Sequence, residues 1–378
     1  MRLPKLIFFN YRTLAKVLLF IIPLTILARV YWPDQPVEIT FSALRWPAEI
    51  LLTNQQDKND IVDALKYVNE LRQPGPPEKM ALYKIAVQHG KEQINYLITE
   101  DGEYFTTEGT MILPSYRLRE QVKVYLGKLE RQSPYGQLLT WQDARQIFSR
   151  YTKGTVEDLD TGLRFNVQRR AGDYHADVQP LTSNDTEIMK EIYNGQWSWR
   201  RRAVIIEVGN TRLAASMSGY PHGAGAIRHN NFDGHFCIHF KDSTTHQSPN
   251  KTDLAHQIMV WKAAGRQPEM FKYAQPEKVA EVFLIAVSQH ASDIALSTLV
   301  EEPKFNSEEF DIDIKKISNL SYELQKMDLQ TNTLQVNLRI DYAGGPRNVK
   351  KELELKMVHS MGYWWKIDPR SITKIFAF

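Results

Sequence analysis

The stretch that most constrains the fold is an alternating run around the chain's single cysteine. Apolar side chains occupy every second position at Phe236, Ile238 and Phe240, which is the period of a half-buried β-strand facing a core. The three residues on the opposite face are His235, Cys237 and His239. An imidazole beside a thiol can accept its proton, which is what a cysteine nucleophile requires. The run therefore predicts a strand whose polar face carries a thiol between two imidazoles.

The N-terminus predicts an anchored protein. The apolar segment from Leu14 to Trp32 is long enough to cross a bilayer if Lys16 and Arg29 extend to its two interfaces. Basic residues before the segment, with aromatic residues at its end, favour a cytoplasmic N-terminus. We therefore expect residues 1–32 to form a cytoplasmic tail and a single-pass signal anchor in the lipid bilayer of the cell membrane, with an extracytoplasmic bulk. A cleavable signal peptide and a buried helix are the alternatives.

Composition narrows the role of the thiol and the class of partner. An exported protein with one cysteine cannot form an internal disulfide, so Cys237 is either a residue without a role or a functional group. The net charge is +3 over 378 residues. With no block of basic residues, this charge argues against a nucleic-acid partner. The sequence gives no indication of the oligomeric state.

Beyond the anchor, the expected fold class is α+β multidomain, with three parts. We expect a small α+β domain over residues 33–133 and a β-rich domain with short helices over residues 134–273. Residues 274–378 predict one long helix followed by an antiparallel meander. This order of elements resembles the nuclear-transport-factor-2-like (NTF2-like) fold, which by itself implies no activity.

Local patterns place several elements within these parts. Apolar residues at helical spacing predict a helix over residues 61–71. Asn184, with Glu187 three residues on, predicts the start of another helix, and Asp253 opens a third. The pair Gly209-Asn210 predicts a two-residue turn between strands over residues 203–208 and 211–217.

The residues around the cysteine resemble the catalytic motif of the L,D-transpeptidases of the YkuD-like type. That family carries a His-Gly pair and, after a spacer of similar length, Ser-His-Gly-Cys-Ile/Val-Arg. The matching residues here are His222-Gly223 and Gly234-His235-Phe236-Cys237-Ile238-His239. The resemblance extends over residues 155–256 and implies that this part is the catalytic domain. Gly234, Phe236 and His239 depart from the family's serine, glycine and arginine, which shape the oxyanion site and hold the substrate carboxylate.

The resemblance implies a membrane-anchored cysteine acyl transferase or peptidase acting on peptidoglycan stem peptides. Cys237 would be the nucleophile that carries a thioester, His235 its base, and His222 a residue lining the site. An amine or water would accept the acyl group, and no cofactor is expected. The residues expected at the substrate are Gly223, Arg228, His239, Ser243 and His246.

Two other functions stay open at this point. A zinc-dependent cell-wall peptidase would draw its metal ligands from His175, Asp177, His235 and His239. Ligands at alternate positions of one extended strand, five residues long, span about 13 Å at about 3.3 Å per residue. One ion would therefore need ligands from outside that strand. A non-enzymatic cell-envelope binding or scaffold protein is the second alternative, because residues 197–202 combine tryptophans with arginines that suit sugars and carboxylates.

Overall fold

The computed structural model describes most of the chain beyond its N-terminus. The described residues are 37–65, 68–71, 81–99, 101–245, 248–271, 274–303, 305–360 and 364–376. The chain divides into two compact units, Met1–Pro134 and Tyr135–Phe378. The predicted membrane-spanning segment, residues 14–32, lies outside the described residues. Within these ranges no helix has the length and apolarity needed to cross a membrane, so the transmembrane helix in the expected fold class has no counterpart in the described part of the chain.

The first unit is an antiparallel sheet with two helices. Its strands pair in the order β2-β1-β4-β5-β6-β7-β3. The strands are β1 (Val37–Ala43), β2 (Glu49–Leu51), β3 (Asn69–Leu71), β4 (Ala81–His89), β5 (Glu92–Thr99), β6 (Tyr104–Thr106) and β7 (Met111–Leu113). The helices are α3 (Gln55–Leu65) and α4 (Tyr116–Glu130). Helix α4 buries one apolar face, and on this face the ring of Tyr125 stacks on Phe41 of β1.

The helix predicted over residues 61–71 ends earlier than its apolar spacing indicates. Helix α3 stops at Leu65, and Asn69–Leu71 form β3, which pairs with β7. An apolar spacing of three or four residues over so short a run fits either structure. Strand pairing, which satisfies the backbone hydrogen bonds of residues 69–71, decided the outcome.

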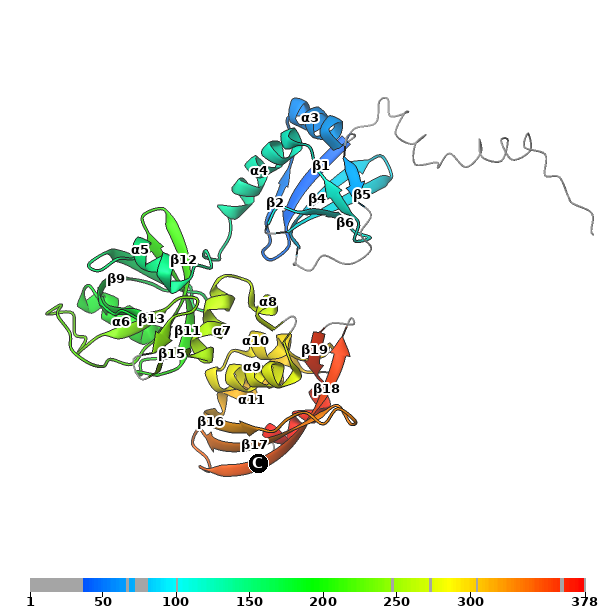
Figure 1. Cartoon of the computed structure of the whole chain (residues 1–378). Coiled ribbons are helices and arrows are strands. Elements are labelled where there is room, and N and C mark those ends of the chain that lie inside the picture. The colour runs from blue at the N-terminus through cyan, green and yellow to red at the C-terminus, as the bar shows by residue number, and fades with distance from the viewer. Residues whose placement is uncertain are drawn as a thin grey trace, which may run out of the picture. The chain divides into compact units, whose positions relative to one another are not determined.

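Six strands of the second unit close into a barrel (Figure 1). They are arranged in the order β10-β13-β12-β11-β8-β9. Their bounds are β8 (Lys153–Asp158), β9 (Arg164–Ala171), β10 (Ala176–Pro180), β11 (Arg201–Val208), β12 (Thr211–Ser218) and β13 (Phe236–His239). The predicted hairpin is confirmed, because β11 and β12 pair with Val208 opposite Thr211. The expected fold class named only a β-rich domain here, and the structure makes it a closed barrel.

The interior of the barrel is apolar because alternate residues of its strands point inward. Its fully buried side chains include Val156, Phe165, Val167, Val178, Val204, Phe236 and Ile238. The surrounding elements are α5 (Trp141–Ile147), α6 (Ser183–Ile192), α7 (Leu254–Ala263), α8 (Gln267–Phe271), β14 (Thr244–Thr245) and β15 (Ser248–Thr252). Asp253 caps α7 as predicted. Helix α6 instead begins after Thr182, whose side chain forms a capping box with Asp185, so its N-cap lies two residues earlier than predicted.

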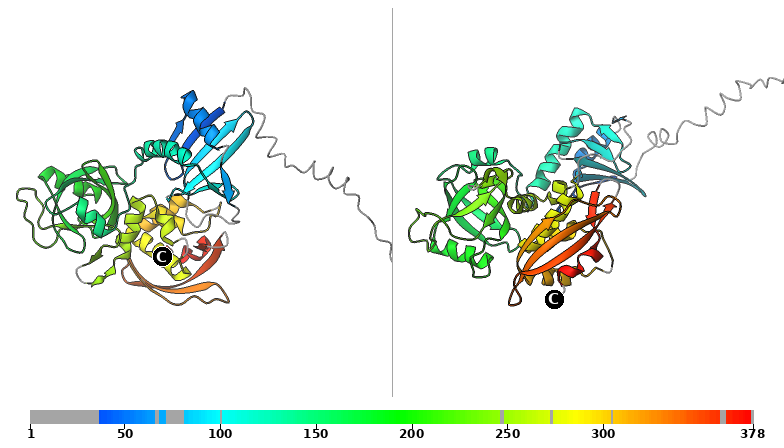
Figure 2. Two further views of the ribbon diagram at one scale, coloured as in Figure 1. Left: turned by 45° about the horizontal axis from the view of Figure 1, so that its top comes forward. Right: turned by 60° about the horizontal axis from the view of Figure 1, so that its bottom comes forward.

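The remainder of the second unit packs helices against an antiparallel sheet. The helices are α9 (Pro276–Gln289), α10 (Ser292–Ser297) and α11 (Ser307–Lys315). The sheet has the order β16-β17-β18-β19, with strands Ile317–Leu324, Thr333–Tyr342, Val349–Ser360 and Trp364–Ile367. Two 3-10 turns, η1 (Pro369–Ser371) and η2 (Thr373–Ile375), follow. Figure 2 shows the helices lying against one face of this sheet. The expected helix followed by a meander is present, whereas the NTF2-like resemblance stays a prediction.

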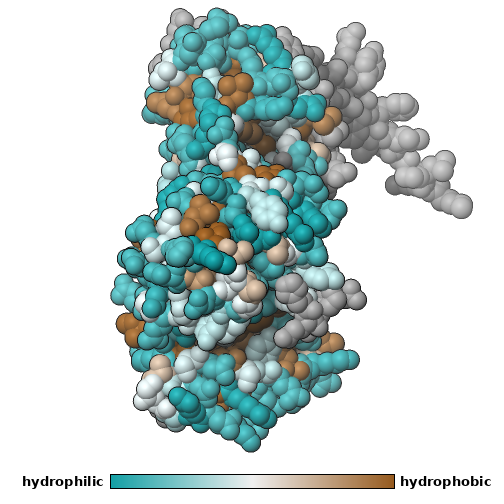
Figure 3. Space-filling model, turned by 90° about the vertical axis from the view of Figure 1, so that its left-hand side faces the viewer, coloured by the Kyte–Doolittle hydropathy of each residue, from teal (hydrophilic) through white to brown (hydrophobic). Residues whose placement is uncertain are grey.

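This sheet and the barrel share one hydrophobic core. Ala203 and Ile205 of β11 and Ala214 of β12 belong to the same buried cluster as Phe283 of α9 and Leu338 of β17. The strand pair β11–β12 therefore has an apolar face on each side, which explains its nearly continuous run of buried residues. On the face drawn in Figure 3, exposed hydrophobic residues form small groups separated by hydrophilic ones.

Candidate active site

Strand β13 places the cysteine between two neighbouring strands of the barrel. Cys237 lies opposite Asp177 of β10, and His239 lies opposite Ser216 of β12. The side chains of Phe236 and Ile238 fill the barrel core, so Cys237 and His239 point to the other face. That face was expected to be open. The structure covers it, and Cys237 is only 8% exposed and His239 2%.

A short backbone bridge brings His222 to the start of β13. The main-chain N–H of His222 donates to the main-chain carbonyl of His235 at 2.9 Å, and the main-chain N–H of His235 donates to that of His222 at 2.8 Å. The bridge is flanked by two glycines with left-handed φ, Gly223 at +62° and Gly234 at +104°. A Cβ added to Gly234 would lie 2.4 Å from the His222 oxygen. Glycine at this position therefore permits the close approach of the two segments.

His222 is the imidazole in hydrogen-bonding contact with the thiol. Its Nε2 lies 3.2 Å from Cys237 Sγ, and its Nδ1 lies 2.8 Å from the carbonyl oxygen of Tyr220. Because a carbonyl can only accept, Nδ1 carries the proton and Nε2 is left able to accept the thiol proton. The resemblance implied His235 as the base, whereas the geometry gives this contact to His222.

A second imidazole contacts the sulfur from the buried side of the site. His175 immediately precedes β10, donates from Nδ1 to the carbonyl oxygen of Thr244 at 2.8 Å, and hydrogen-bonds Cys237. Its Nε2 is 3.4 Å from Asp177 Oδ1. Burial opposes protonation, but the hydrogen bonds with Asp177 and Cys237 outweigh it and raise the pKa of His175 to about 10. Both ring nitrogens face acceptors, an arrangement that favours the imidazolium form of His175.

These two imidazoles set the protonation of the thiol. Burial alone would raise the pKa of Cys237, but the hydrogen bonds and the nearby charges of His175 and His222 outweigh it, and the pKa lies below its ordinary value. The hydrogen bond with Cys237 raises the pKa of His222, against the effect of partial burial. A lowered thiol pKa beside a raised imidazole pKa is the electrostatic arrangement of an activated cysteine.

His235 takes a different position from the one expected of a base. Its Nδ1 lies 3.0 Å from the carbonyl oxygen of Ala224, and its Nε2 is 3.7 Å from Asp177 Oδ1. Its ring meets that of His222 edge-on, with centroids 4.6 Å apart. His235 therefore stands beside the thiol–imidazole pair without a hydrogen bond to the sulfur among the described contacts.

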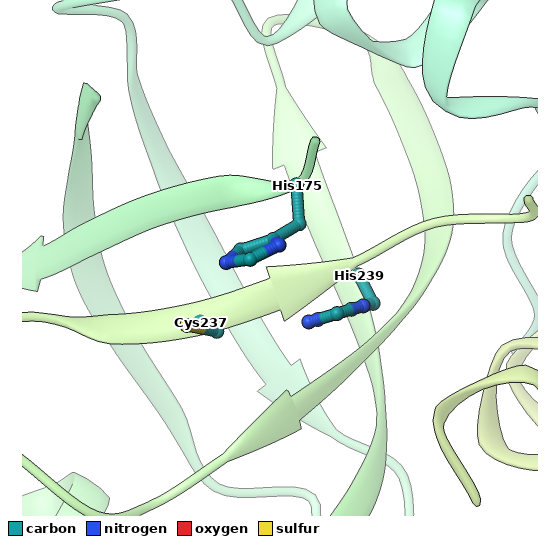
Figure 4. A group of neighbouring side chains, drawn as sticks. All are labelled: His175, Cys237 and His239. Carbon is teal, nitrogen blue, oxygen red and sulfur yellow. The ribbon is translucent and has the colours of Figure 1, made fainter. Parts of the chain in front are cut away.

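Behind the thiol, three imidazoles form a buried stack. The ring of His239 stacks on that of His175, with centroids 4.4 Å apart (Figure 4). On its other face it stacks on the ring of His256, with centroids 3.7 Å apart. His256 comes from α7, and its Nδ1 is 2.9 Å from Ser216 Oγ. Burial lowers the pKa of both His239 and His256 well below its ordinary value, so these two rings are neutral. His256 was not among the residues expected at the site, although its place in the first turn of a helix opened by Asp253 was predictable.

Aromatic side chains border the site on its solvent side. Trp199 and Tyr220 stack with centroids 5.0 Å apart, and Trp199 also contacts the ring of His222 at 5.1 Å. Trp199 and Tyr220 are 49% and 43% exposed. A substrate would therefore meet the His222 side of the sulfur, because the His175 side is sealed.

The other residues expected at the substrate are dispersed. Arg228 is exposed on the loop between His222 and β13, and Gly223 lies against the His235 ring. Ser243 is fully buried, where its Oγ accepts from the N–H of Phe240, so it closes a turn. His246 lies outside the described residues.

Two groups of side chains bring three possible metal-ligating atoms to within 4.8 Å of one another. They are His175, Cys237 and His239, and His222, His235 and Cys237. Both contain the thiol, and neither contains Asp177. The expected zinc set of His175, Asp177, His235 and His239 is thus not gathered as one group, although Asp177 lies near two of its imidazoles.

Comparisons of the chain with protein-family models, with curated proteins and with solved structures found no match. The relation to L,D-transpeptidases therefore stays a prediction from the motif. The geometry around the thiol supports a chemical role independently of that relation.

Proposed function

We propose that the protein is a cysteine-dependent acyl transferase or peptidase with Cys237 as nucleophile and His222 as general base. One observation carries the proposal. The 3.2 Å contact joins the sulfur to an imidazole nitrogen whose tautomer is set by the Tyr220 carbonyl. This is the geometry by which an imidazole activates a thiol for attack on a carbonyl.

The chemistry proceeds in two steps. His222 Nε2 accepts the thiol proton, and the sulfur attacks a peptide carbonyl carbon to form a tetrahedral oxyanion. As the C–N bond breaks, His222 returns the proton to the departing amine, and a thioester remains on Cys237. An amine or water then attacks the thioester and gives its proton to His222. The S–C bond breaks, and the departing thiolate takes that proton back from His222 Nε2, which restores the thiol.

His175 acts as a positioning residue for this chemistry. It is fixed by the Thr244 carbonyl and lies beside Asp177, so its positive charge stays next to the sulfur without being needed as a proton carrier. A fixed cation stabilises the thiolate before attack and spares His222 for proton transfer. The division of roles follows from access, because His175 is 2% exposed whereas His222 is partly open to solvent.

Stem peptides of peptidoglycan are the substrate class that we propose. Support comes from the motif resemblance and from the open aromatic border at Trp199 and Tyr220. Such a substrate would require the folded part of the chain to lie outside the cytoplasm. Gly234, Phe236 and His239 differ from the residues of the family motif. At the position where the family has an arginine that holds the substrate carboxylate, His239 is buried in the imidazole stack and cannot contact that carboxylate.

Intact-mass spectrometry after incubation with a stem tetrapeptide tests the proposal. Wild-type protein should gain the mass of the acyl group, hydroxylamine should remove it, and released terminal residue should accumulate. Cys237→Ala should show neither effect, and His222→Gln should slow acylation by about 10²–10⁴-fold, the usual contribution of a general base. His229→Asn is the matched control, because His229 is an exposed histidine of the same loop with φ of +63°, which asparagine tolerates. Equal product from wild type and Cys237→Ala would reject the proposal.

A further inference from the structure

We infer that the site also binds one Zn²⁺ through Cys237 Sγ, His222 Nε2 and His235 Nε2, and that the bound ion reversibly blocks the nucleophile. The binding part of the inference stands on geometry alone. The blocking part rests on the proposed function, because it concerns the same sulfur.

The three ligand atoms already converge. One atom from each residue lies within 4.8 Å of the others, and the sulfur is 3.2 Å from His222 Nε2. A tetrahedral zinc ion with Zn–N of about 2.0–2.1 Å and Zn–S of about 2.3 Å places neighbouring ligand atoms about 3.4–3.6 Å apart. Small rotations of the side chains therefore suffice to enclose the ion.

The two imidazoles are held as metal-ligating histidines are held. His222 and His235 each direct Nδ1 to a main-chain carbonyl, of Tyr220 and Ala224 respectively. This outer hydrogen bond fixes the ring and leaves the Nε2 lone pair free for the ion. The acyl-transfer mechanism explains this arrangement at His222 but uses no atom of His235, so metal binding accounts for a residue that the proposed reaction leaves without a role.

The second group of candidate ligands does not fit one ion. The rings of His175 and His239 lie nearly parallel, at 13°, with centroids 4.4 Å apart (Figure 4). A metal is bound by nitrogen lone pairs, which lie in the plane of the ring, and an ion between two stacked rings would lie well outside both planes. His222 and His235 meet at 61°, so their ring planes can intersect at a shared ion. The geometry thus selects the group that includes His222.

The ligand types and the open side favour zinc. A ligand set of one thiolate and two imidazoles binds Zn²⁺ in preference to harder cations such as Mg²⁺ or Ca²⁺. Catalytic zinc sites leave a fourth coordination position to water. Asp177 Oδ1, 3.7 Å from His235 Nε2, lies close enough to hydrogen-bond that water. On binding, the S–H bond of Cys237 breaks, its proton passes to solvent and the S–Zn bond forms, with no change of oxidation state. The sulfur is then unavailable to a carbonyl carbon.

Cobalt substitution tests the site without using activity. Reduced, chelator-treated protein is titrated with Co²⁺, and the thiolate-to-cobalt charge-transfer band and the visible bands of a tetrahedral site are recorded. Wild type and His229→Asn should saturate at one equivalent, and zinc should abolish the spectrum. Cys237→Ala should lose the charge-transfer band, and His235→Gln should bind more than about tenfold more weakly, since even outer partners of metal ligands contribute that much.

Each outcome decides between the parts of the inference. Absence of the charge-transfer band in the folded wild type overturns it, as does an unchanged affinity in His235→Gln; circular dichroism confirms that each variant is folded. A saturating band together with full alkylation of Cys237 by iodoacetamide would overturn the blocking part. A cobalt band in a protein that never acylates would reject the proposed function and leave metal binding standing, whereas acylation without a band would do the reverse.

Discussion

Replacing Gly234 with alanine tests whether the bridge between His222 and His235 holds the base against the thiol. A Cβ at this position would lie 2.4 Å from the carbonyl oxygen of His222, whereas optimal non-bonded contact is at about 3.5–4.0 Å. The His222 backbone must therefore retreat by about 1 Å. Because His222 Nε2 lies 3.2 Å from the sulfur, such a movement takes it out of hydrogen-bonding reach.

The matched control is Gly162→Ala. Gly162 also has a left-handed φ, +71°, but a Cβ there would meet nothing within 4 Å. The free energy of unfolding of this control should fall only by the cost of placing alanine at a left-handed φ, about 1–2 kcal/mol, with no change at the thiol. Gly234→Ala adds overpacking of about 1–3 kcal/mol to a similar term, so its total loss should be about 2–5 kcal/mol.

Urea unfolding measures the stability difference, and iodoacetamide alkylation measures the thiol. Alkylation of Cys237 in Gly234→Ala at mildly acidic pH should slow on the order of tenfold, the effect of raising the thiol pKa by about one. If both variants lose the same stability and alkylate at the wild-type rate, the bridge does not hold His222 against the thiol.

Three further predictions follow from the site and the core. In chelator-treated wild type, alkylation of Cys237 should persist at pH values below the ordinary thiol pKa, because the pKa of Cys237 is lowered. In His222→Gln the curve of alkylation rate against pH should move to higher pH. An unmoved curve would show that the hydrogen bond from His222 does not lower the thiol pKa. Asp253 caps α7, and its carboxylate forms an ion pair with Arg201 at 2.6 Å. Burial would raise the pKa of Asp253, but the charge of Arg201 outweighs burial, so this pKa lies below its ordinary value. Its stabilisation is therefore present above the unfolded-state pKa of about 3.9 and is lost as pH falls through the lower folded value. Asp253→Ala should cost about 0.5–2 kcal/mol at pH 7 from the cap and should flatten this acid limb in urea titrations. Phe283→Ala, in the fully buried core of the second unit, should cost about 3–5 kcal/mol, and calorimetry showing less than about 1 kcal/mol would contradict the packing.

Elements with a strong local signal were predictable from the sequence. The hairpin at Gly209-Asn210 and the cap at Asp253 formed as expected, because two-residue turns and N-caps are decided by a few adjacent residues. The strand around Cys237 also formed. Where polar residues two positions apart offered similar caps, the prediction failed, and Thr182 took the role assigned to Asn184.

Features set by distant residues were not predictable in this way. Closure of the barrel depends on β10 pairing with both β9 and β13, and no local pattern encodes that pairing. The same pairing brings His175 to Cys237 across sixty-two positions of sequence. Choosing His222 over His235 as the base required knowing that the Nε2 of His222 lies 3.2 Å from the Cys237 sulfur, which side-chain spacing along a strand does not reveal.

The hydrophobic cluster shared by β11, β12, α9 and β17 has a consequence for how the second unit comes apart. Removing the residues beyond Gln275 would leave Ala203, Ile205 and Ala214 facing water, so an isolated barrel fragment should aggregate or be degraded. Heating should melt Tyr135–Phe378 in one cooperative step. A protease that cuts the chain ahead of α9 would thereby inactivate the thiol without ever touching it.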